Sequence, residues 1–176
     1  VIVSALSGVK AETEKIWQYA CRYEMPRLVF INKMDRENAN FSMALGELEK
    51  SFGSAPIPLN IPIGSAERFE GIIDLIEMKA VRFQNGQPSV SDIPAELKDE
   101  ADEYRKKLVE KIVESNDVML EKYLEGHEIT PDEVKKVLRE ATIQLKITPV
   151  LCGSSFKNKG VQKLLDAVVD FLPSPM

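Results

Sequence analysis

The stretch LVFINKMDREN, residues 28–38, decides how the rest of the sequence is interpreted. It starts with the aliphatic and aromatic residues of a buried parallel strand and changes abruptly at Asn32 to amide, ammonium and carboxylate groups. Ligands bind to open parallel sheets in the loops that follow the carboxyl ends of the strands. The sequence therefore predicts a strand at 28–31 and a binding loop that contains Asn32, Lys33 and Asp35.

Two more short aliphatic runs, at 1–6 and 147–152, have the composition of buried parallel strands. A stretch with helical spacing of apolar residues follows each of the three runs, at 11–23, 41–52 and 161–172. This alternation predicts a doubly wound α/β sheet. In the last of these helices the apolar positions are Val161, Leu164, Leu165, Val168, Val169 and Leu172.

The pattern changes between residues 54 and 146, which we expect to form an inserted α+β subdomain between sheet parts at 1–53 and 147–176. Strands are predicted at 71–78 and 79–84, with a turn signal at Asn85-Gly86. The helices that follow are mostly charged, and the first has one apolar stripe and two pairs spaced for salt bridges, Asp102 with Lys106 and Glu103 with Lys107. That stripe comprises Leu97, Ala101, Tyr104, Leu108 and Ile112.

The last helix of the inserted segment has a clear start in the residues TPDE. Thr130 is placed to cap the helix, Pro131 suits its first turn and Glu133 completes a capping box. The sequence therefore predicts that this helix begins at 131.

The loop after residue 31 has the groups that would recognise guanine. The carboxylate of Asp35 only accepts hydrogen bonds, and guanine offers two adjacent donors, N1 and the exocyclic N2, which adenine lacks. Asn32 is able to donate to guanine N7 and to tie neighbouring loops together, while the alkyl stem of Lys33 lies along the base. The alternative is an ordinary turn, because these residue types are common after strands.

A second loop, in ITPVLCGSSFKNKGV, follows the strand at 147–152. The backbone N–H groups of Ser154 and Ser155 are candidates to donate to guanine O6, and Phe156 is a candidate to shield the base or the ribose. Two such loops at neighbouring strand ends would share one ligand. The alternative for this loop is an ordinary strand-to-helix turn.

The segments NKMDRENANF and CGSSFKNKGVQKLLDAVVDFLPSP, together with PRLVFINKMDR and EGIIDLIEMKA, resemble the GTP-binding domain of the bacterial translation elongation factor G family. The resemblance covers essentially the whole chain. It implies a P-loop-NTPase-type sheet, of which this chain holds the C-terminal part. It also implies guanine recognition by Asn32, Lys33 and Asp35 and by Ser154, Ser155 and Phe156, although the family usually has Ala at the position of Ser155.

The resemblance further implies a GTPase that moves transfer RNA and messenger RNA through the ribosome, with GTP or GDP as its ligand and Mg²⁺ in the intact protein. The inserted subdomain of the family is associated with the ribosomal stalk protein. Close paralogues, ribosomal protection proteins and peptide-release GTPases remain alternatives within the same class.

A phosphate-binding loop of the form G-x-x-x-x-G-K-[ST] does not occur in the sequence. In SGVKAET the glycine, lysine and threonine have the wrong spacing. The start without Met at VIVSAL and the end in FLPSPM also indicate a piece of a longer protein. We therefore expect no catalytic residue, no metal ligand and no GTP hydrolysis in this chain alone, with weak guanine nucleotide binding at most.

The composition disfavours three further classes, namely nucleic-acid-binding, disulfide-rich and membrane proteins. A net charge of -5 gives no long-range attraction for phosphate backbones, so we expect no direct nucleic-acid site. The two cysteines, Cys21 and Cys152, do not form a disulfide framework, and no apolar run approaches the roughly 20 residues of a membrane helix. These features favour the cytoplasm.

Other residues with chemical potential lack a supporting constellation. The carboxylates at 99–100 and 102–103 belong to a helix rich in opposite charge, His127 has no nucleophile nearby in the sequence, and Trp17 is better interpreted as a core anchor than as a stacking residue. Two function classes therefore stay open. One is the guanine-binding part of a GTPase, and the other is a non-enzymatic α/β scaffold whose helical module contacts a protein partner.

Overall fold

The computed structural model describes residues 1–53, 55–84 and 87–174. Four parallel strands form the central sheet in the order β1-β2-β8-β3. They are β1 (Ile2–Ser4), β2 (Val29–Asn32), β8 (Thr148–Cys152) and β3 (Pro56–Pro58). The predicted α/β class with a parallel sheet is confirmed, and the sheet places β2 and β8 side by side.

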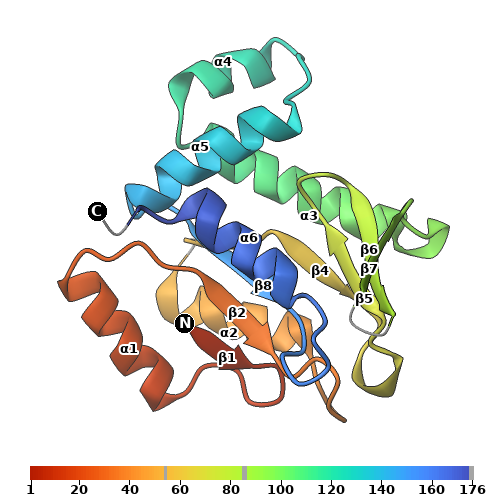
Figure 1. Cartoon of the computed structure of the whole chain (residues 1–176). Coiled ribbons are helices and arrows are strands. Elements are labelled where there is room, and N and C mark those ends of the chain that lie inside the picture. Colours follow the sequence, from red (N-terminus) through yellow and green to blue (C-terminus); the bar gives the residue numbers. More distant parts are fainter. Residues whose placement is uncertain (54, 85–86, 175–176) are drawn as a thin grey trace.

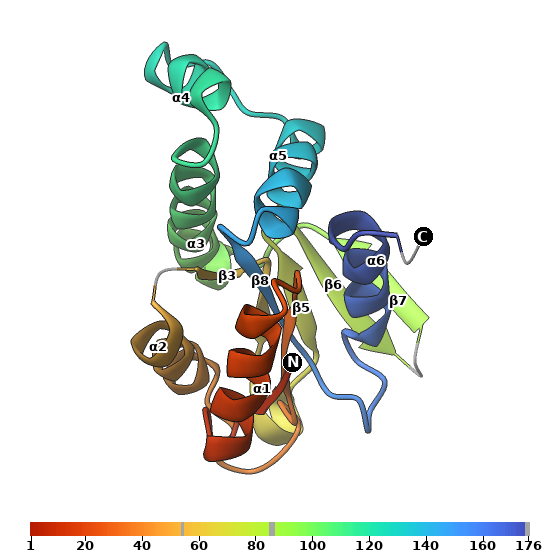
Figure 2. The ribbon, with the colours of Figure 1, turned by 90° about the vertical axis from the view of Figure 1, so that its left-hand side faces the viewer.

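Helices cover both faces of this sheet. They are α1 (Ala11–Arg22), α2 (Phe41–Phe52) and α6 (Val161–Phe171). Figures 1 and 2 show α6 on one face and α2 on the other. On the α2 side, the ring of Trp17 in α1 stacks on Phe52 with the ring centroids 4.0 Å apart. Trp17 is 7% exposed, which confirms its interpretation as a core anchor.

The second sheet is antiparallel and has the order β4-β5-β6-β7. Its strands are β4 (Asn60–Ile63), β5 (Gly71–Asp74), β6 (Lys79–Gln84) and β7 (Gln87–Ser91), with a short 3₁₀ turn, η1 (Ala66–Arg68), between β4 and β5. The strand predicted at 79–84 is confirmed, whereas the turn predicted at 85–86 lies outside the described residues. All of β7 is exposed, at an edge of the sheet.

The strand predicted at 71–78 ends early, at Asp74. The carboxylate of Asp74 accepts hydrogen bonds from the backbone N–H groups of Ile76 (2.9 Å) and Glu77 (3.1 Å). Such a bond from an aspartate to the backbone two residues on closes a local turn, so the chain leaves the sheet here. The apolar residues that follow are buried in this turn and not in a strand.

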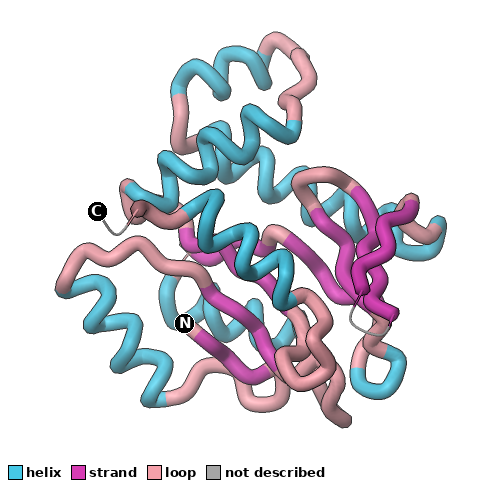
Figure 3. Tube along the Cα trace, in the orientation of Figure 1, coloured by secondary structure: helices cyan, strands magenta, loops and turns pink. Residues whose placement is uncertain are grey.

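Three helices form the remaining layer, namely α3 (Ala95–Val113), α4 (Asp117–Leu124) and α5 (Pro131–Ile143). Figure 3 shows them together beyond the strands, and α5 packs against both α3 and α6. The predicted stripe of α3 faces the core, where Ala101, Leu108 and Ile112 are fully buried. Of its two expected ion pairs, Glu103–Lys107 forms at 2.6 Å, while Lys106 lies 3.9 Å from Glu110.

Part of the segment expected to be an insertion belongs to the parallel sheet. Residues 56–58 pair with β8 as strand β3, and the N–H of Leu59 then donates to Val150 O at 2.8 Å. The two sheets therefore join directly through a continuous chain at 56–63, over one hydrophobic core. The division at residues 53/54 and 146/147 stays a prediction.

Three of the apolar positions identified in α6 are exposed. Leu165, Val168 and Val169 are 60%, 42% and 76% exposed, and the helix is anchored by Ala167 and Phe171 instead. Apolar residues occupy most of the circumference of this helix, so spacing alone does not identify the face that packs on the sheet.

The capping box predicted for α5 is confirmed, because Thr130 Oγ1 accepts from Glu133 N and Glu133 Oε2 accepts from Thr130 N at 2.9 Å. A hydrogen bond from Lys122 Nζ at 2.6 Å, followed by those from Thr130, lowers the pKa of Glu133 from 4.5 to about 2. A carboxylate with a lowered folded-state pKa stabilises the fold above its unfolded pKa. This contribution is therefore present above about pH 4.5 and is lost as the pH falls towards about 2.

We expect an NMR titration of the Glu133 side chain to show a midpoint near pH 2. Lys122→Met removes the strongest of its hydrogen bonds and is expected to move the midpoint towards 4.5. Lys98→Met, at an exposed position in α3, is the matched control and leaves the midpoint in place. A wild-type midpoint at 4.5 contradicts the described hydrogen bonds from Lys122 and Thr130 to the Glu133 carboxylate.

The two thiols differ in accessibility. Cys21 is exposed, while Cys152 is buried in β8 and burial raises the pKa of its thiol. The thiolate is the reactive form, so a thiol-specific reagent is expected to modify one thiol of the native chain and the second only after a denaturant is added. Cys21→Ser removes the fast reaction. Rapid modification of two thiols without denaturant argues against the burial of Cys152.

Candidate functional site

The loop after β2 presents polar residues on either side of a buried anchor. Asn32 and Asp35 are half-buried and Lys33 is exposed, whereas Met34 between them is fully buried. Lys33 has a φ of 69°, a left-handed conformation that is uncommon outside glycine. The N–H of Met34 donates to Gly153 O at 3.1 Å, which fixes this loop against the one that follows β8.

The loop after β8 is a tight turn. The N–H of Ser154 donates to Lys159 O at 2.8 Å, and the N–H of Lys159 donates back to Ser154 O at 2.9 Å. Gly153 is needed at its position, because a Cβ there would lie 2.4 Å from Lys159 O. Gly160 closes the turn with a φ of 84° and leads directly into α6.

Asn32 joins the two loops, 123 residues apart in the chain. Its Nδ2 donates to Ser155 Oγ at 2.9 Å, and its Oδ1 accepts from the N–H groups of Ser155 (3.0 Å) and Lys33 (2.7 Å). The two polar loops predicted at neighbouring strand ends therefore lie together, since β2 and β8 are adjacent in the sheet. The side chain of Asn32 holds one loop relative to the other.

Asp35 and Phe156, one from each loop, line the same cavity, which has a volume of about 440 Å³. Phe156 is 80% exposed at its rim. No other described side chain forms a hydrogen bond or ion pair with the Asp35 carboxylate, so it keeps its acceptor capacity for a ligand. A ring that stacks and a carboxylate that accepts are the groups that bind a flat heterocycle with N–H donors.

The backbone donors expected from the second loop are both engaged in the structure. The N–H of Ser154, which is itself fully buried, bonds Lys159 O, and the N–H of Ser155 bonds Asn32 Oδ1. Donation by Ser155 to a ligand would require only that the exposed Asn32 contact opens, whereas donation by Ser154 would require the turn itself to open. Both roles stay predictions.

The cavity wall also contains residues that were not identified as site residues from the sequence, namely Arg36, Ala66, Glu67, Phe69, Lys157 and Lys159. Three of them, Ala66, Glu67 and Phe69, belong to the segment between β4 and β5. In the chain these three residues lie more than 30 positions after the loop that follows β2, which we call the NKMD loop after its residues 32–35. The only local signal there is Gly64-Ser65, which predicts a turn but not its neighbours.

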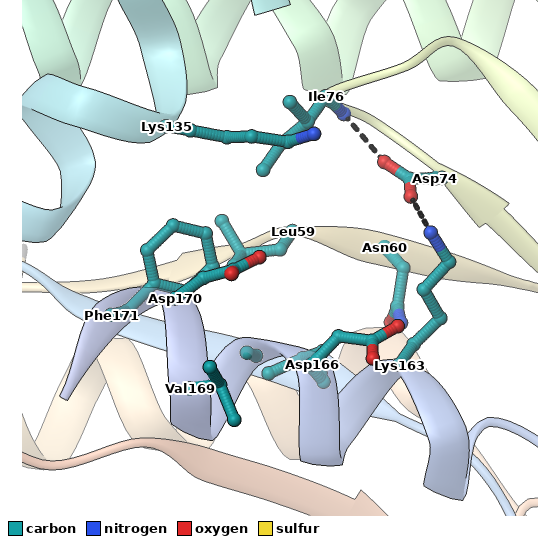
Figure 4. Close-up of a pocket in the computed structure, with 12 residues that line it drawn as sticks. Leu59, Asn60, Asp74, Ile76, Lys135, Lys163, Asp166, Val169, Asp170 and Phe171 are labelled. Carbon is teal, nitrogen blue, oxygen red and sulfur yellow. Dashed lines mark hydrogen bonds and ion pairs between the residues drawn. The ribbon is translucent and has the colours of Figure 1, made fainter. Parts of the chain in front are cut away.

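A second cavity of about 400 Å³ lies between α6, α5 and the strands β4 and β5 (Figure 4). Lys163 Nζ and Asp74 Oδ2 form an ion pair across it at 2.8 Å. Asn60 reaches the parallel sheet from here, since its Oδ1 accepts from Cys152 N at 2.8 Å. None of the six predicted site residues lines this cavity.

His127 is another residue with chemical potential in the sequence. His127 is exposed and lies 3.3 Å from Glu125. In the part of the chain that the structure describes, no group of three or more His, Cys, Asp or Glu side chains is placed to hold a metal ion. Within the same residues, no helix has the length and apolarity needed to cross a bilayer.

Comparison with known proteins agrees with this arrangement. Residues 1–174 match the family described as the elongation factor Tu GTP binding domain. A crystal structure of a protein from Thermus thermophilus superimposes with a TM-score of 0.89 at 34% sequence identity. The match covers 98% of this chain and 26% of that protein, so the chain spans about a quarter of the length of its structural relative.

The structure places two polar loops at the ends of adjacent parallel strands. The family match extends over nearly the whole chain, including both loops. The chain belongs to the elongation factor Tu GTP-binding domain family.

Proposed function

We propose that this chain is the guanine-recognising part of a longer translational GTPase. The observation that supports this most directly is the contact between Asn32 and Ser155, which joins two loops whose Asp35 and Phe156 line one cavity. The carboxylate of Asp35 accepts from guanine N1 and N2, and the stem of Lys33 lies along the base. Phe156 covers the base or the ribose.

Recognition of O6 is assigned to the backbone of the second loop. Of its two donors, Ser155 N–H is the accessible one, because Ser155 is exposed and Ser154 is fully buried. Guanine O6 would take the place of Asn32 Oδ1 as the acceptor, and the freed Asn32 amide would turn to donate to N7. The serine hydroxyl is not needed for this contact, so its presence where the family usually has Ala is compatible with the role.

The phosphate loop, the switch segments and the catalytic residue belong, in this proposal, to other parts of the parent protein. This chain has no G-x-x-x-x-G-K-[ST] sequence, the loop that cradles the phosphates and places a hydroxyl on Mg²⁺. We therefore expect that the chain alone does not hydrolyse GTP and binds guanine nucleotides weakly. GTP turnover above a buffer blank, kept after repurification, would contradict this expectation.

For the parent protein we propose the role of elongation factor G or a close paralogue. It would couple GTP hydrolysis to movement of transfer RNA and messenger RNA on the ribosome, in the cytoplasm, and its inserted segment at 54–146 would contact the ribosomal stalk protein. The match covers 26% of the structural relative, so that relative has a long part outside the match. A parent protein of similar length would be long enough to contain the further domains that this role needs.

A non-enzymatic scaffold with a protein-binding module is the second candidate. It is favoured by the helix α4, where Val118 and Leu124 are 74% and 75% exposed at the tip of the helical layer. Exposed aliphatic residues on one short helix suit a protein partner. The two candidate functions are compatible if the parent is a GTPase that contacts a partner protein through this helical layer.

The two candidates are separated by adding guanosine and adenosine monophosphates, at millimolar concentration, to the isotope-labelled chain and following its amide NMR signals. Guanine recognition predicts saturable shifts at Asp35, Ser155 and Phe156 with the guanosine nucleotide and none with the adenosine nucleotide. Equal shifts with both, or none with either, would favour the scaffold.

A further inference from the structure

A third loop, residues 64–69, closes against both loops of the candidate site. The N–H of Ala66 donates to Met34 O at 2.9 Å, which joins it to the NKMD loop. Lys159 Nζ donates to Phe69 O at 2.5 Å, which joins it to the loop after β8. The bond from Met34 N to Gly153 O completes the set, so each of the three loops is bonded to the other two.

The cavity that contains Asp35 is lined by all three loops. Ala66, Glu67 and Phe69 of the third loop contribute to its wall together with Asp35 and Phe156. Phe69 is 1% exposed and lies beneath the ammonium of Lys159, 5.8 Å from the ring centroid. A buried ring under a half-buried cation leaves little freedom for this wall to move independently.

The backbone conformations of the three loops also indicate that their contacts hold them in place. Each loop contains a non-glycine residue with positive φ: Lys33 (69°), Ala66 (54°) and Asn158 (50°). Such conformations are strained and persist where the surroundings over-determine them. For Ala66, the surroundings include the bond from its N–H to Met34 O.

We propose that the 64–69 loop is a third wall of the guanine site and that Lys159 is the positioning residue that holds it. Lys159 does so from both ends, because its backbone pairs with Ser154 while its ammonium bonds Phe69 O. The proposal rests on the proposed function for the identity of the ligand, but not for the loop contacts themselves.

The test compares the wild-type chain with Lys159→Met, which keeps the alkyl stem and removes the ammonium, and with Lys159→Arg, which restores a cation. Lys136→Met, at an exposed position in α5, is the matched control. The first measurement uses no ligand. We expect hydrogen exchange at the amides of Ser154 and Ala66 to be about 10-fold faster in Lys159→Met, which corresponds to the loss of one hydrogen bond to a charged group. We expect Lys159→Arg to restore slow exchange and Lys136→Met to leave it unchanged.

The second measurement is the dissociation constant for guanosine monophosphate. A positioning role predicts that it rises by about 10-fold in Lys159→Met and returns towards the wild-type value in Lys159→Arg. Wild-type exchange rates in Lys159→Met overturn the proposal, whether or not the nucleotide binds. Faster exchange with an unchanged dissociation constant also overturns it, since the loop is then no wall of the site. If the wild-type chain binds no guanosine nucleotide, the proposed function fails and the exchange result alone decides whether Lys159 holds the loops.

Discussion

Asp35→Asn is expected to lower guanine nucleotide affinity by about 10²- to 10⁴-fold in the full-length protein that carries this chain. The carboxylate is proposed to accept from two N–H groups of guanine, and each hydrogen bond to a charged group contributes about 1.5–3 kcal/mol. The asparagine amide also turns a donor towards the donor at N2. Xanthine carries a carbonyl in place of that amino group, so the variant is expected to prefer xanthine nucleotides.

The measurement is a pair of titrations, with guanosine and xanthosine diphosphates, of the wild-type protein and the variant. Asp99→Asn is the matched control, because Asp99 is an exposed carboxylate of α3 outside the cavity, and it should leave both affinities unchanged. A variant that still prefers guanine would show that Asp35 does not contact the base edge. It would remove the main support for the proposed site.

Trp17→Ala is expected to have the largest effect on stability, about 3–5 kcal/mol. The indole is 7% exposed, stacks on Phe52 with an interplanar angle of 7° and lies 4.6 Å from the guanidinium carbon of Arg27. Truncation leaves a cavity between α1 and α2 and exposes the Phe52 ring. Because domains of this size are stable by about 5–15 kcal/mol, the variant should be close to the limit of folding.

Urea unfolding followed by far-ultraviolet circular dichroism measures this change, since Trp17 is the only tryptophan and its fluorescence is lost with it. Trp17→Phe keeps an aromatic ring against Phe52 and should recover most of the loss. Tyr23→Ala removes an aromatic residue that is 67% exposed just after the same helix and should change stability by less than about 0.5 kcal/mol. Equal midpoints for Trp17→Ala and the wild type would contradict a core role.

The strand–loop–helix units could be predicted from the sequence because their signals are local. The aliphatic run at 28–31, the polar residues after it and the apolar spacing of 41–52 lie within one short stretch, and the helix α2 spans the predicted residues. The capping box at Thr130 and Glu133 was equally local. Placing the two candidate loops together needed one further rule, that the carboxyl ends of parallel strands meet at one edge.

The parts that could not be predicted depend on contacts distant in sequence. Lys159 and Phe69 are 90 residues apart, and neither has a local pattern that marks it as part of a site. The exposed side of α6 has the same cause, since Leu165 and Val169 have the spacing of a buried stripe and only the packing of Ala167 and Phe171 shows which side is covered. The early end of β5 has a local cause. Asp74 is a residue type that favours turns, but the apolar residues that follow it led to the prediction of a longer strand.

The two outer strands β1 and β7 have opposite consequences for how copies of the chain meet in concentrated solution. An open strand edge offers unpaired N–H and C=O groups to another chain. In β1 that edge is short and aliphatic, with Ile2 70% exposed, so it is the one inclined to recruit a neighbour. In β7 the residues are mostly polar and include Pro88, which cannot donate, so this edge discourages pairing. Aggregation of the isolated chain should therefore begin at β1, and a lysine in place of Ile2 should raise its solubility.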